Sequence, residues 1–214
     1  MVVITPSDVH TNWSNKELAL VNEMLARGLP LLHVRKPQLT FDDLQKWVEK
    51  VSYQHLHRLV IHIPTPVINN KEKVFKQYVQ LINSLRADFT HLSTTNCSFV
   101  NNYEGKLPYL STSVHNSTEY TKLSTQHQRV FLSPVFSSIS KTGYHPTVDW
   151  QQEIQQWSFP WIQRVALGGI TPERLPLVQA MGFDDFAVLG AIWHAQEPLK
   201  IFDLCYKQDP LFFP

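Results

Sequence analysis

The chain has 214 residues, of which 43% are hydrophobic, and this suits one globular domain with a substantial core and argues against disorder. The formal net charge of +1 gives no general field for nucleic acid or cations, so a charged ligand must be held by a local site. Cys97 and Cys205 lack CxxC spacing, and no stretch approaches the roughly 20 apolar residues of a membrane helix. We therefore expect a cytoplasmic protein that binds neither nucleic acid nor a membrane.

Short apolar runs alternate with longer segments of helical periodicity along the chain. The runs show little polar–apolar alternation, which is typical of parallel strands buried on both faces. In chain order, the expected strands are Val2–Thr5, Leu31–Val34, Leu59–Ile63, Phe89–Leu92, Tyr109–Ser113, Val130–Leu132, Arg164–Leu167 and Phe186–Leu189.

Capping residues mark the starts of several helices between these strands. Each start has a hydroxyl residue followed by an acidic residue or a proline within the first turn. The candidates are Ser14 with Glu17, Thr40 with Asp43, Ser117 with Glu119, and Thr171 with Pro172. The first and last of these helices are expected to end near Gly28 and Gly182, respectively.

Eight strands alternating with helices in a chain of this length predict one (β/α)8 TIM barrel domain over residues 1–214. A doubly wound open sheet is the alternative. The segment 93–107 is polar, Asn-rich and poorly helical. The helix after the fourth strand is therefore expected to be missing or reduced.

In such a barrel, active sites lie where the strands end and the following loops begin. Gly168 and Gly169 stand at one such position, directly before a helix start, where backbone N–H groups can converge on an anion. Gly190 follows the next strand, and loops after strands seven and eight often bind phosphate. We therefore expect phosphate binding at Gly168, Gly169, Leu189 and Gly190. The alternative is that the glycines only make tight turns.

Other polar residues follow the remaining strands. Ser138, Ser140 and Lys141 offer hydroxyls and an ammonium suited to a phosphate or carboxylate, although such loops are commonly just solvated. His115 could move a proton near neutral pH, although a structural role is commoner for a histidine. His62 and His91 could join it as metal ligands, but neither strand offers a ligand pair and no carboxylate accompanies them. No metal site is expected.

Taken in order, these segments resemble the thiamine phosphate synthase/TenI superfamily. The resemblance is carried by four motifs: Ser133-Pro134-Val135-Phe136 with Ser138, Ser140 and Lys141; Val165–Thr171; Ser113-Val114-His115; and Phe186–Ile192, with Gly190 where serine is usual. That family is a (β/α)8 barrel. Its synthases join a pyrimidine pyrophosphate to a thiazole phosphate with Mg²⁺ and release pyrophosphate, and its TenI branch is a thiazole tautomerase.

The chain departs from the synthases of this family where they bind magnesium and pyrophosphate. Arg35 remains, but Pro37 replaces the pyrophosphate-binding lysine, and Lys36, one position off, is expected to point the other way. Ile63 replaces one magnesium-binding aspartate, and 93–96 offer no counterpart for the second. Because Mg²⁺ requires hard oxygen ligands, its site is expected to be severely weakened.

The resemblance therefore implies first a TenI-like thiazole tautomerase that needs no cofactor and binds a thiazole phosphate. His115 would shuttle the proton, and the substrate would contact Arg35, Ser113, Ser138, Ser140 and Lys141. His33 is expected to be structural, because strand alternation would turn it away. The alternatives are a synthase with a rearranged Mg²⁺ site and a non-catalytic sensor or carrier of thiamine-pathway phosphates. The apolar tail 211–213 is expected to pack on its own barrel, with a homodimer as the alternative.

Overall fold

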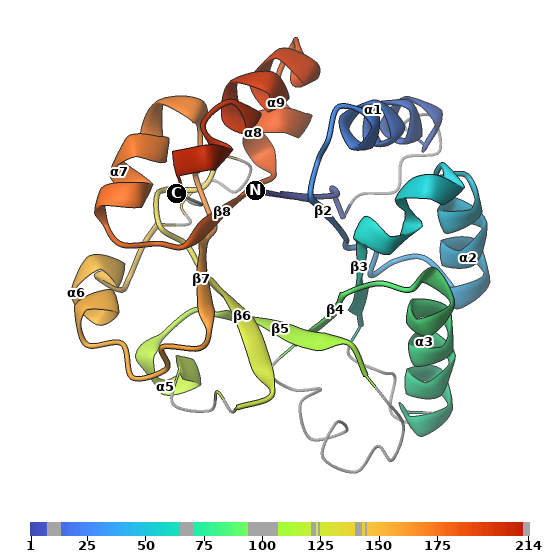
Figure 1. Ribbon diagram of the computed structural model, residues 1–214, viewed down its shortest axis with the longest axis horizontal. Helices are drawn as coiled ribbons and strands as arrows, with labels where there is room; N and C mark the ends of the chain where they lie inside the picture. The colour runs from blue at the N-terminus through green and yellow to red at the C-terminus, as the bar shows by residue number, and fades with distance from the viewer. Residues whose placement is uncertain are drawn as a thin grey trace. The chain divides into compact units, whose positions relative to one another are not determined.

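The computed structural model describes residues 1–7, 14–64, 71–93, 107–120, 123, 125–139, 143 and 145–211. Its eight strands are hydrogen-bonded in sequence order as a closed parallel barrel (Figure 1). They are β1 Val2–Ile4, β2 Leu31–Val34, β3 Leu59–Ile63, β4 Phe89–Leu92, β5 Tyr109–Val114, β6 His127–Leu132, β7 Gln163–Ala166 and β8 Asp185–Val188. The predicted (β/α)8 fold and all eight strands are confirmed. The largest difference is at β6, which begins at His127 rather than Val130.

Helices alternate with these strands. The α-helices are α1 Ser14–Ala26, α2 Phe41–Glu49, α3 Lys71–Leu85, α5 Ser117–Tyr120, α6 Trp150–Gln155, α7 Leu175–Ala180, α8 Gly190–Trp193 and α9 Pro198–Tyr206. The 3-10 helices are η1 Tyr53–Arg58, η3 Pro172–Arg174 and η4 Asp209–Leu211. Most of the connection after β4, residues 94–106, lies outside the described residues, as does most of the tail. No helix in the described ranges combines the length and apolar character that crossing a membrane requires.

The chain packs as two compact units, which are described separately below. Unit 1 comprises Met1–Ile4 with Ser111–Pro214, and unit 2 comprises Thr5–Leu110. The largest fully buried side chains of unit 1 include Phe131, Phe186 and Phe202, and those of unit 2 include Met24, Leu25, Leu29, Leu32, Leu59, Ile61, Ile82 and Leu92. The organisation of residues 1–214 as one domain stays a prediction.

Two helix starts show where local patterns succeed and fail. Thr40 is the N-cap of α2, and its side chain accepts a hydrogen bond from the Asp43 backbone N (3.2 Å), as predicted. The capping box expected at α1 is wrong for Glu17, whose carboxylate instead accepts from Lys36 Nζ (2.7 Å). Lys36 is buried and also donates to the Pro6 carbonyl (2.8 Å). The Glu17 carboxylate, which was expected to cap the start of α1, therefore binds Lys36 from a distant part of the chain instead.

The other two helix starts differ from the expected pattern. One has its cap one residue earlier, and the other opens a 3-10 helix instead of an α-helix. At α5 the cap is Asn116, whose side chain accepts from the Glu119 backbone N (2.9 Å), so Ser117 lies inside the helix. Thr171 does precede Pro172 at a helix start, but that turn is the 3-10 helix η3, and the Thr171 side chain makes no cap hydrogen bond. The α-helix α7 begins only at Leu175.

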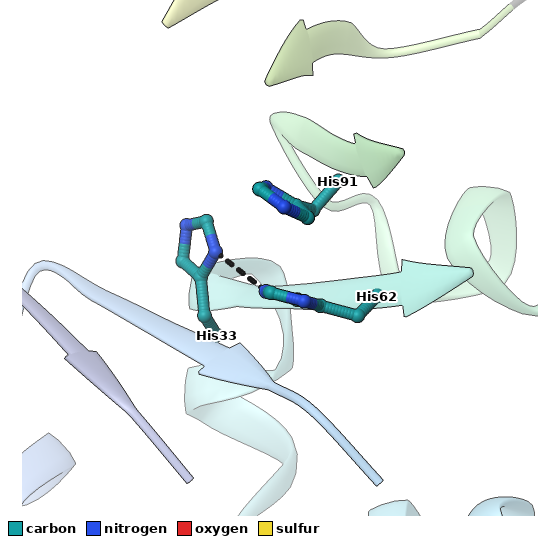
Figure 2. A group of neighbouring side chains, drawn as sticks. All are labelled: His33, His62 and His91. Carbon is teal, nitrogen blue, oxygen red and sulfur yellow. Dashed lines mark hydrogen bonds between the residues drawn. The ribbon is translucent and has the colours of Figure 1, made fainter. Parts of the chain in front are cut away.

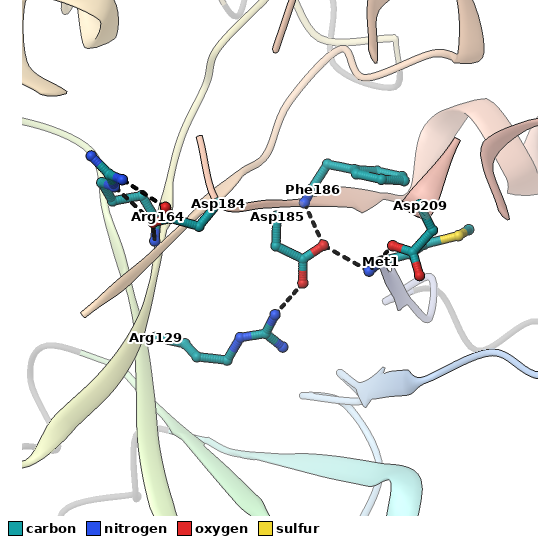
Figure 3. Close-up of polar contacts among 7 residues, drawn as sticks. All are labelled: Met1, Arg129, Arg164, Asp184, Asp185, Phe186 and Asp209. Atoms are coloured by element: carbon teal, nitrogen blue, oxygen red, sulfur yellow. Dashed lines mark hydrogen bonds and ion pairs between the residues drawn. The ribbon is translucent and has the colours of Figure 1, made fainter. Parts of the chain in front are cut away.

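A buried ion pair joins β6 to β8 across β7 in unit 1 (Figure 3). Arg129 contacts the Asp185 carboxylate, and both side chains are buried. The other Asp185 oxygen lies 2.7 Å from the Met1 amino nitrogen. Asp185 is the first residue of β8 and Arg129 lies in the amino-terminal half of β6, toward the end of the barrel where side chains in this fold serve stability rather than catalysis.

Candidate active site

In unit 1, the segment 133–139 after β6 is the common neighbour of the loops after β5, β7 and β8. The Ser133 backbone N donates to the Val114 carbonyl at the end of β5 (3.1 Å). Val135 N donates to the Leu167 carbonyl (2.9 Å), and Phe136 N donates to the Gly168 carbonyl (3.0 Å). These bonds hold the loop after β6 along the end of β7.

Three glycines make this close approach possible. Gly168 and Gly169 have φ angles of +99° and +65°, which L-residues with side chains rarely adopt. A Cβ atom at Gly169 would lie 2.4 Å from the Ser137 carbonyl oxygen, and one at Gly168 would lie 2.8 Å from Pro134 Cα. At Gly190 a Cβ would lie 3.1 Å from Ile139 Cβ. The glycines therefore have a packing role, and phosphate binding at Gly168, Gly169, Leu189 and Gly190 stays a prediction.

His115 lies directly after β5 at the start of the same segment. Its backbone N donates to Glu119 Oε2 (2.8 Å), and its ring Nδ1 lies 3.1 Å from the Ser133 carbonyl oxygen. Because a carbonyl oxygen only accepts, this contact assigns the ring proton to Nδ1 and leaves the lone pair of the neutral ring on Nε2. The exposed His115 ring is thus arranged to accept a proton at Nε2, and the half-buried Ser113 precedes it on β5.

Two further polar side chains, which the sequence did not predict, contact this segment. Arg174 Nη1 donates to the Gly169 carbonyl (2.6 Å), and its guanidinium lies 4.9 Å from the centre of the Phe136 ring. His145 Nδ1 lies 2.8 Å from Ser137 Oγ. Arg174 could have been found as the cation in the first turn after the glycine pair. Ser138 is half-buried within the segment, whereas Ser140 and Lys141 lie outside the described residues.

Arg35 belongs to unit 2, where it directly follows β2. Its side chain is exposed, and its backbone N donates to Thr5 Oγ1 (2.9 Å). The neighbouring Lys36 is buried with Glu17, so the prediction that Lys36 points away from Arg35 is confirmed. Lys36 is therefore not available to replace the lysine that Pro37 displaces.

Unit 2 also brings three histidines together, as Figure 2 shows. His33, His62 and His91 are the penultimate residues of β2, β3 and β4. His33 Nδ1 lies 2.9 Å from His62 Nε2, and the rings of His62 and His91 stack with their centroids 3.9 Å apart. One ring nitrogen of each histidine lies within 4.8 Å of those of the other two.

The expectation that His33 turns away was wrong. His33 and Arg35 are two residues apart, and residues at that spacing on an extended segment share a face, so alternation does not separate them. The sequence carried a signal for the cluster: consecutive members are 29 residues apart, about one strand–helix unit.

Burial keeps two of these rings uncharged. It lowers the pKa of His62 well below the usual value, and the neighbouring His91, His33 and Arg35 add to the effect. Burial, and then the positive charge of Arg35, lowers the pKa of His91 to about 3. At neutral pH both rings therefore present nitrogen lone pairs, the form that binds metals.

These side chains do not fit magnesium. Mg²⁺ takes oxygen ligands in near-octahedral geometry, whereas the described ends of β3 and β4 offer imidazoles beside Ile63 and Leu92. The correspondence with the synthase carboxylates therefore fails at these positions within the part of the chain that the structure describes.

Comparisons with known proteins agree with this fold. The family model described as thiamine monophosphate synthase matches residues 1–192. The thiamine-phosphate synthase of Streptococcus suis (strain 98HAH33) is 27% identical over 193 residues, covering 86% of this chain and 79% of that protein.

Two solved structures, each described as a thiamine phosphate pyrophosphorylase, share the architecture at low identity. The protein from Bacteroides thetaiotaomicron has a TM-score of 0.69 at 20% identity, covering 99% of this chain and 96% of that one. The protein from Pyrococcus furiosus has a TM-score of 0.70 at 16% identity, covering 100% of this chain and 96% of that one. These likenesses show the fold alone, but the family match extends over most of the chain. The protein belongs to the thiamine monophosphate synthase family.

Proposed function

We propose that the protein is a thiamine phosphate synthase, which joins a pyrimidine pyrophosphate to a thiazole phosphate and releases pyrophosphate. The family match over residues 1–192 carries this proposal, since it includes the loops after β6, β7 and β8 that meet at segment 133–139. The S. suis relative bears the same activity in its name. These findings favour the synthase over the tautomerase expected from the sequence.

The thiazole phosphate would bind on segment 133–139 and its neighbours. The N–H groups of Gly168, Gly169 and Gly190, with Leu189 beside them, would hold the phosphate, because converging backbone donors suit a multiply charged anion. Arg174 adds a positive charge beside Gly169. The remaining contacts of the thiazole phosphate would come from Ser113, Ser138, Ser140 and Lys141.

A thiazole tautomerase is the second candidate, and the His115–Ser133 contact favours it. With the proton fixed on Nδ1, His115 Nε2 would take a proton from one position of the thiazole ring system and return it to another. This reaction asks nothing of the ends of β3 and β4, where the described residues do not fit Mg²⁺.

The two reactions are separated by their products. Chelator-treated protein is incubated with the pyrimidine pyrophosphate and the thiazole phosphate, first without metal and then with different divalent metals added one at a time. The thiamine phosphate formed is measured in each case. Formation of thiamine phosphate supports the synthase. If none forms with any metal, the synthase is excluded, and conversion of the thiazole tautomer is then measured.

His115→Asn identifies the role of the imidazole, with the exposed His57→Asn as the matched control. A tautomerase would lose about 100-fold or more in turnover with thiazole phosphate affinity retained, as expected for loss of a general acid–base group. A synthase would keep most of its turnover in both variants. A protein that binds thiazole phosphate but turns over neither substrate is the sensor or carrier.

A further inference from the structure

We propose that His33, His62 and His91 form a binding site for a divalent transition metal such as zinc, with three imidazole ligands and one coordination position open. This site goes beyond thiamine phosphate formation and does not depend on it. No residue of unit 1 is needed to supply the three ligands.

The register of the hydrogen-bonded strands fixes the backbone positions of the three histidines. His62 and His91 are register partners on β3 and β4, and His33 is the partner of Val60, two residues before His62. Because residues two apart share a face, all three side chains leave the same face of adjacent strands. Sites built on strands hold their ligands more accurately than sites on loops. Little backbone ordering is therefore required when a metal binds.

The ring nitrogens are close to the spacing that a metal requires. Zinc–nitrogen bonds of about 2.0–2.1 Å in tetrahedral geometry separate neighbouring ligand atoms by about 3.3 Å. His33 Nδ1 and His62 Nε2 are 2.9 Å apart, and every such pair lies within 4.8 Å. Ring movements on the order of 1 Å would bring all three nitrogens to coordination distance.

The ligand set selects the class of metal. Imidazole nitrogens suit zinc, copper, nickel and iron, whereas magnesium and calcium prefer oxygen. The cluster contains only histidines among the described residues. Three protein ligands with a fourth position open to water or substrate are typical of catalytic rather than structural zinc.

Arg35 indicates what the fourth position would take. Arg35 follows His33 by two residues and so shares its face of the extended segment, where its positive charge would oppose a bare cation at the cluster. A negatively charged oxygen on the metal would offset both charges. The open position is therefore suited to hydroxide or to an oxygen of phosphate or pyrophosphate.

The same rings could instead form only a hydrogen-bonded polar layer, since the His33–His62 contact needs no metal. Metal titration of the full-length protein decides between the two. Chelator-treated wild-type protein is titrated with Zn²⁺ by calorimetry, and with Co²⁺ while the visible absorption of tetrahedral cobalt is recorded. We expect one metal per chain. Wild-type protein that binds neither metal would overturn the proposal.

Two variants test whether the metal binds to these histidines. His62→Gln and His91→Gln should each weaken Zn²⁺ binding by about 100-fold or more, since even the loss of a group that only hydrogen-bonds to a metal ligand costs about 10–100-fold in affinity. His57→Gln, an exposed histidine of the same unit, should bind like wild type. Near-UV circular dichroism verifies that each variant is folded. Wild-type affinity in a folded His62→Gln protein would contradict the assignment.

Two further measurements use only wild-type protein, so they do not depend on whether a variant folds. Its thermal midpoint should rise with Zn²⁺ concentration, because a ligand that binds only the folded state stabilises it. Pyrophosphate or inorganic phosphate should change the visible absorption spectrum of the cobalt-loaded protein. An unchanged spectrum would overturn the proposal that the fourth coordination position is open to these anions. Failure of the synthase assay leaves all these readings intact, so the two proposals fail separately.

Discussion

Lys36 Nζ lies 2.7 Å from Glu17 Oε2, and both side chains are buried. Removing one member of a buried pair leaves the other charge uncompensated, at a cost of about 3–5 kcal/mol. We therefore expect Lys36→Ala to lower the free energy of unfolding by about that amount in urea denaturation. Lys46→Ala, which removes an exposed pair with Asp43 (3.6 Å), should cost at most about 1 kcal/mol. Equal losses in the two variants would contradict a stabilising role for the buried pair.

The same variant should show a pH dependence of defined sign. Burial raises the pKa of Glu17, while Lys36 acts to lower it. Without Lys36, the folded pKa should rise further above the unfolded value, so the folded state binds more protons than the unfolded state between those two pKa values. Stability must then fall as pH rises through this window. The deficit of Lys36→Ala against wild type should therefore shrink as the pH is lowered below neutral, as measured by denaturation at each pH.

Adjacent aspartates at the start of β8 should differ in their importance. Asp185 is buried against Arg129, whereas Asp184 pairs with Arg164 at a partly exposed position. We expect Asp185→Ala to cost about 3–5 kcal/mol of unfolding free energy, because it removes the buried carboxylate that both Arg129 and the Met1 amino group contact. Asp184→Ala should cost about 1 kcal/mol. Thermal or urea denaturation of the two variants tests this difference, and a larger loss at Asp184 would refute it.

Gly169→Ala should disrupt the proposed thiazole phosphate site more than Gly143→Ala. Both glycines have positive φ angles, so alanine strains the backbone at either position by about 1 kcal/mol or more. At Gly169 the new Cβ would collide with neighbouring atoms, 2.4 Å from the Ser137 carbonyl oxygen, whereas at Gly143 no atom of the described residues would lie within 4 Å of it. We expect thiazole phosphate affinity to fall at least about tenfold in Gly169→Ala alone, as measured by calorimetry. Similar affinities in the two variants would argue against phosphate binding at this loop.

Cys205 should be unreactive in the folded protein. It is fully buried, and burial, with a contribution from Glu173, raises the pKa of its thiol to about 12. At pH 8 only about one molecule in ten thousand would carry the reactive thiolate. In a Cys97→Ser background, a thiol reagent should label Cys205 only after urea is added. Rapid labelling without urea would show that α9 opens readily.

Whether a structural feature of this protein can be predicted from the sequence depends on how far apart along the chain the interacting residues lie. Strands such as Leu59–Ile63 were predicted because five successive residues carry the signal, and the Thr40 cap was predicted because its partner lies three residues away. The start of β6 was missed because His127-Gln128-Arg129 is polar, and the buried Arg129 contacts Asp185, which lies 56 residues later.

The site shows the same limit. His115 was identified from a motif, but its orientation depends on the Ser133 carbonyl, 18 residues away, which no local pattern reveals. The histidine cluster was missed because each strand contributes a single member, and the ligands become a set only through strand pairing.

The contacts of segment 133–139 limit how this protein could be re-engineered. Because the segment lies against Gly168, Gly169 and Gly190 without room for a Cβ at the first two, its path is tied to two later loops. A bulkier segment grafted from another family member would collide unless those loops were transferred with it. Substrate range in this chain should therefore change by exchanging the three loops as one cassette, and single-loop chimaeras should express poorly or lose the site.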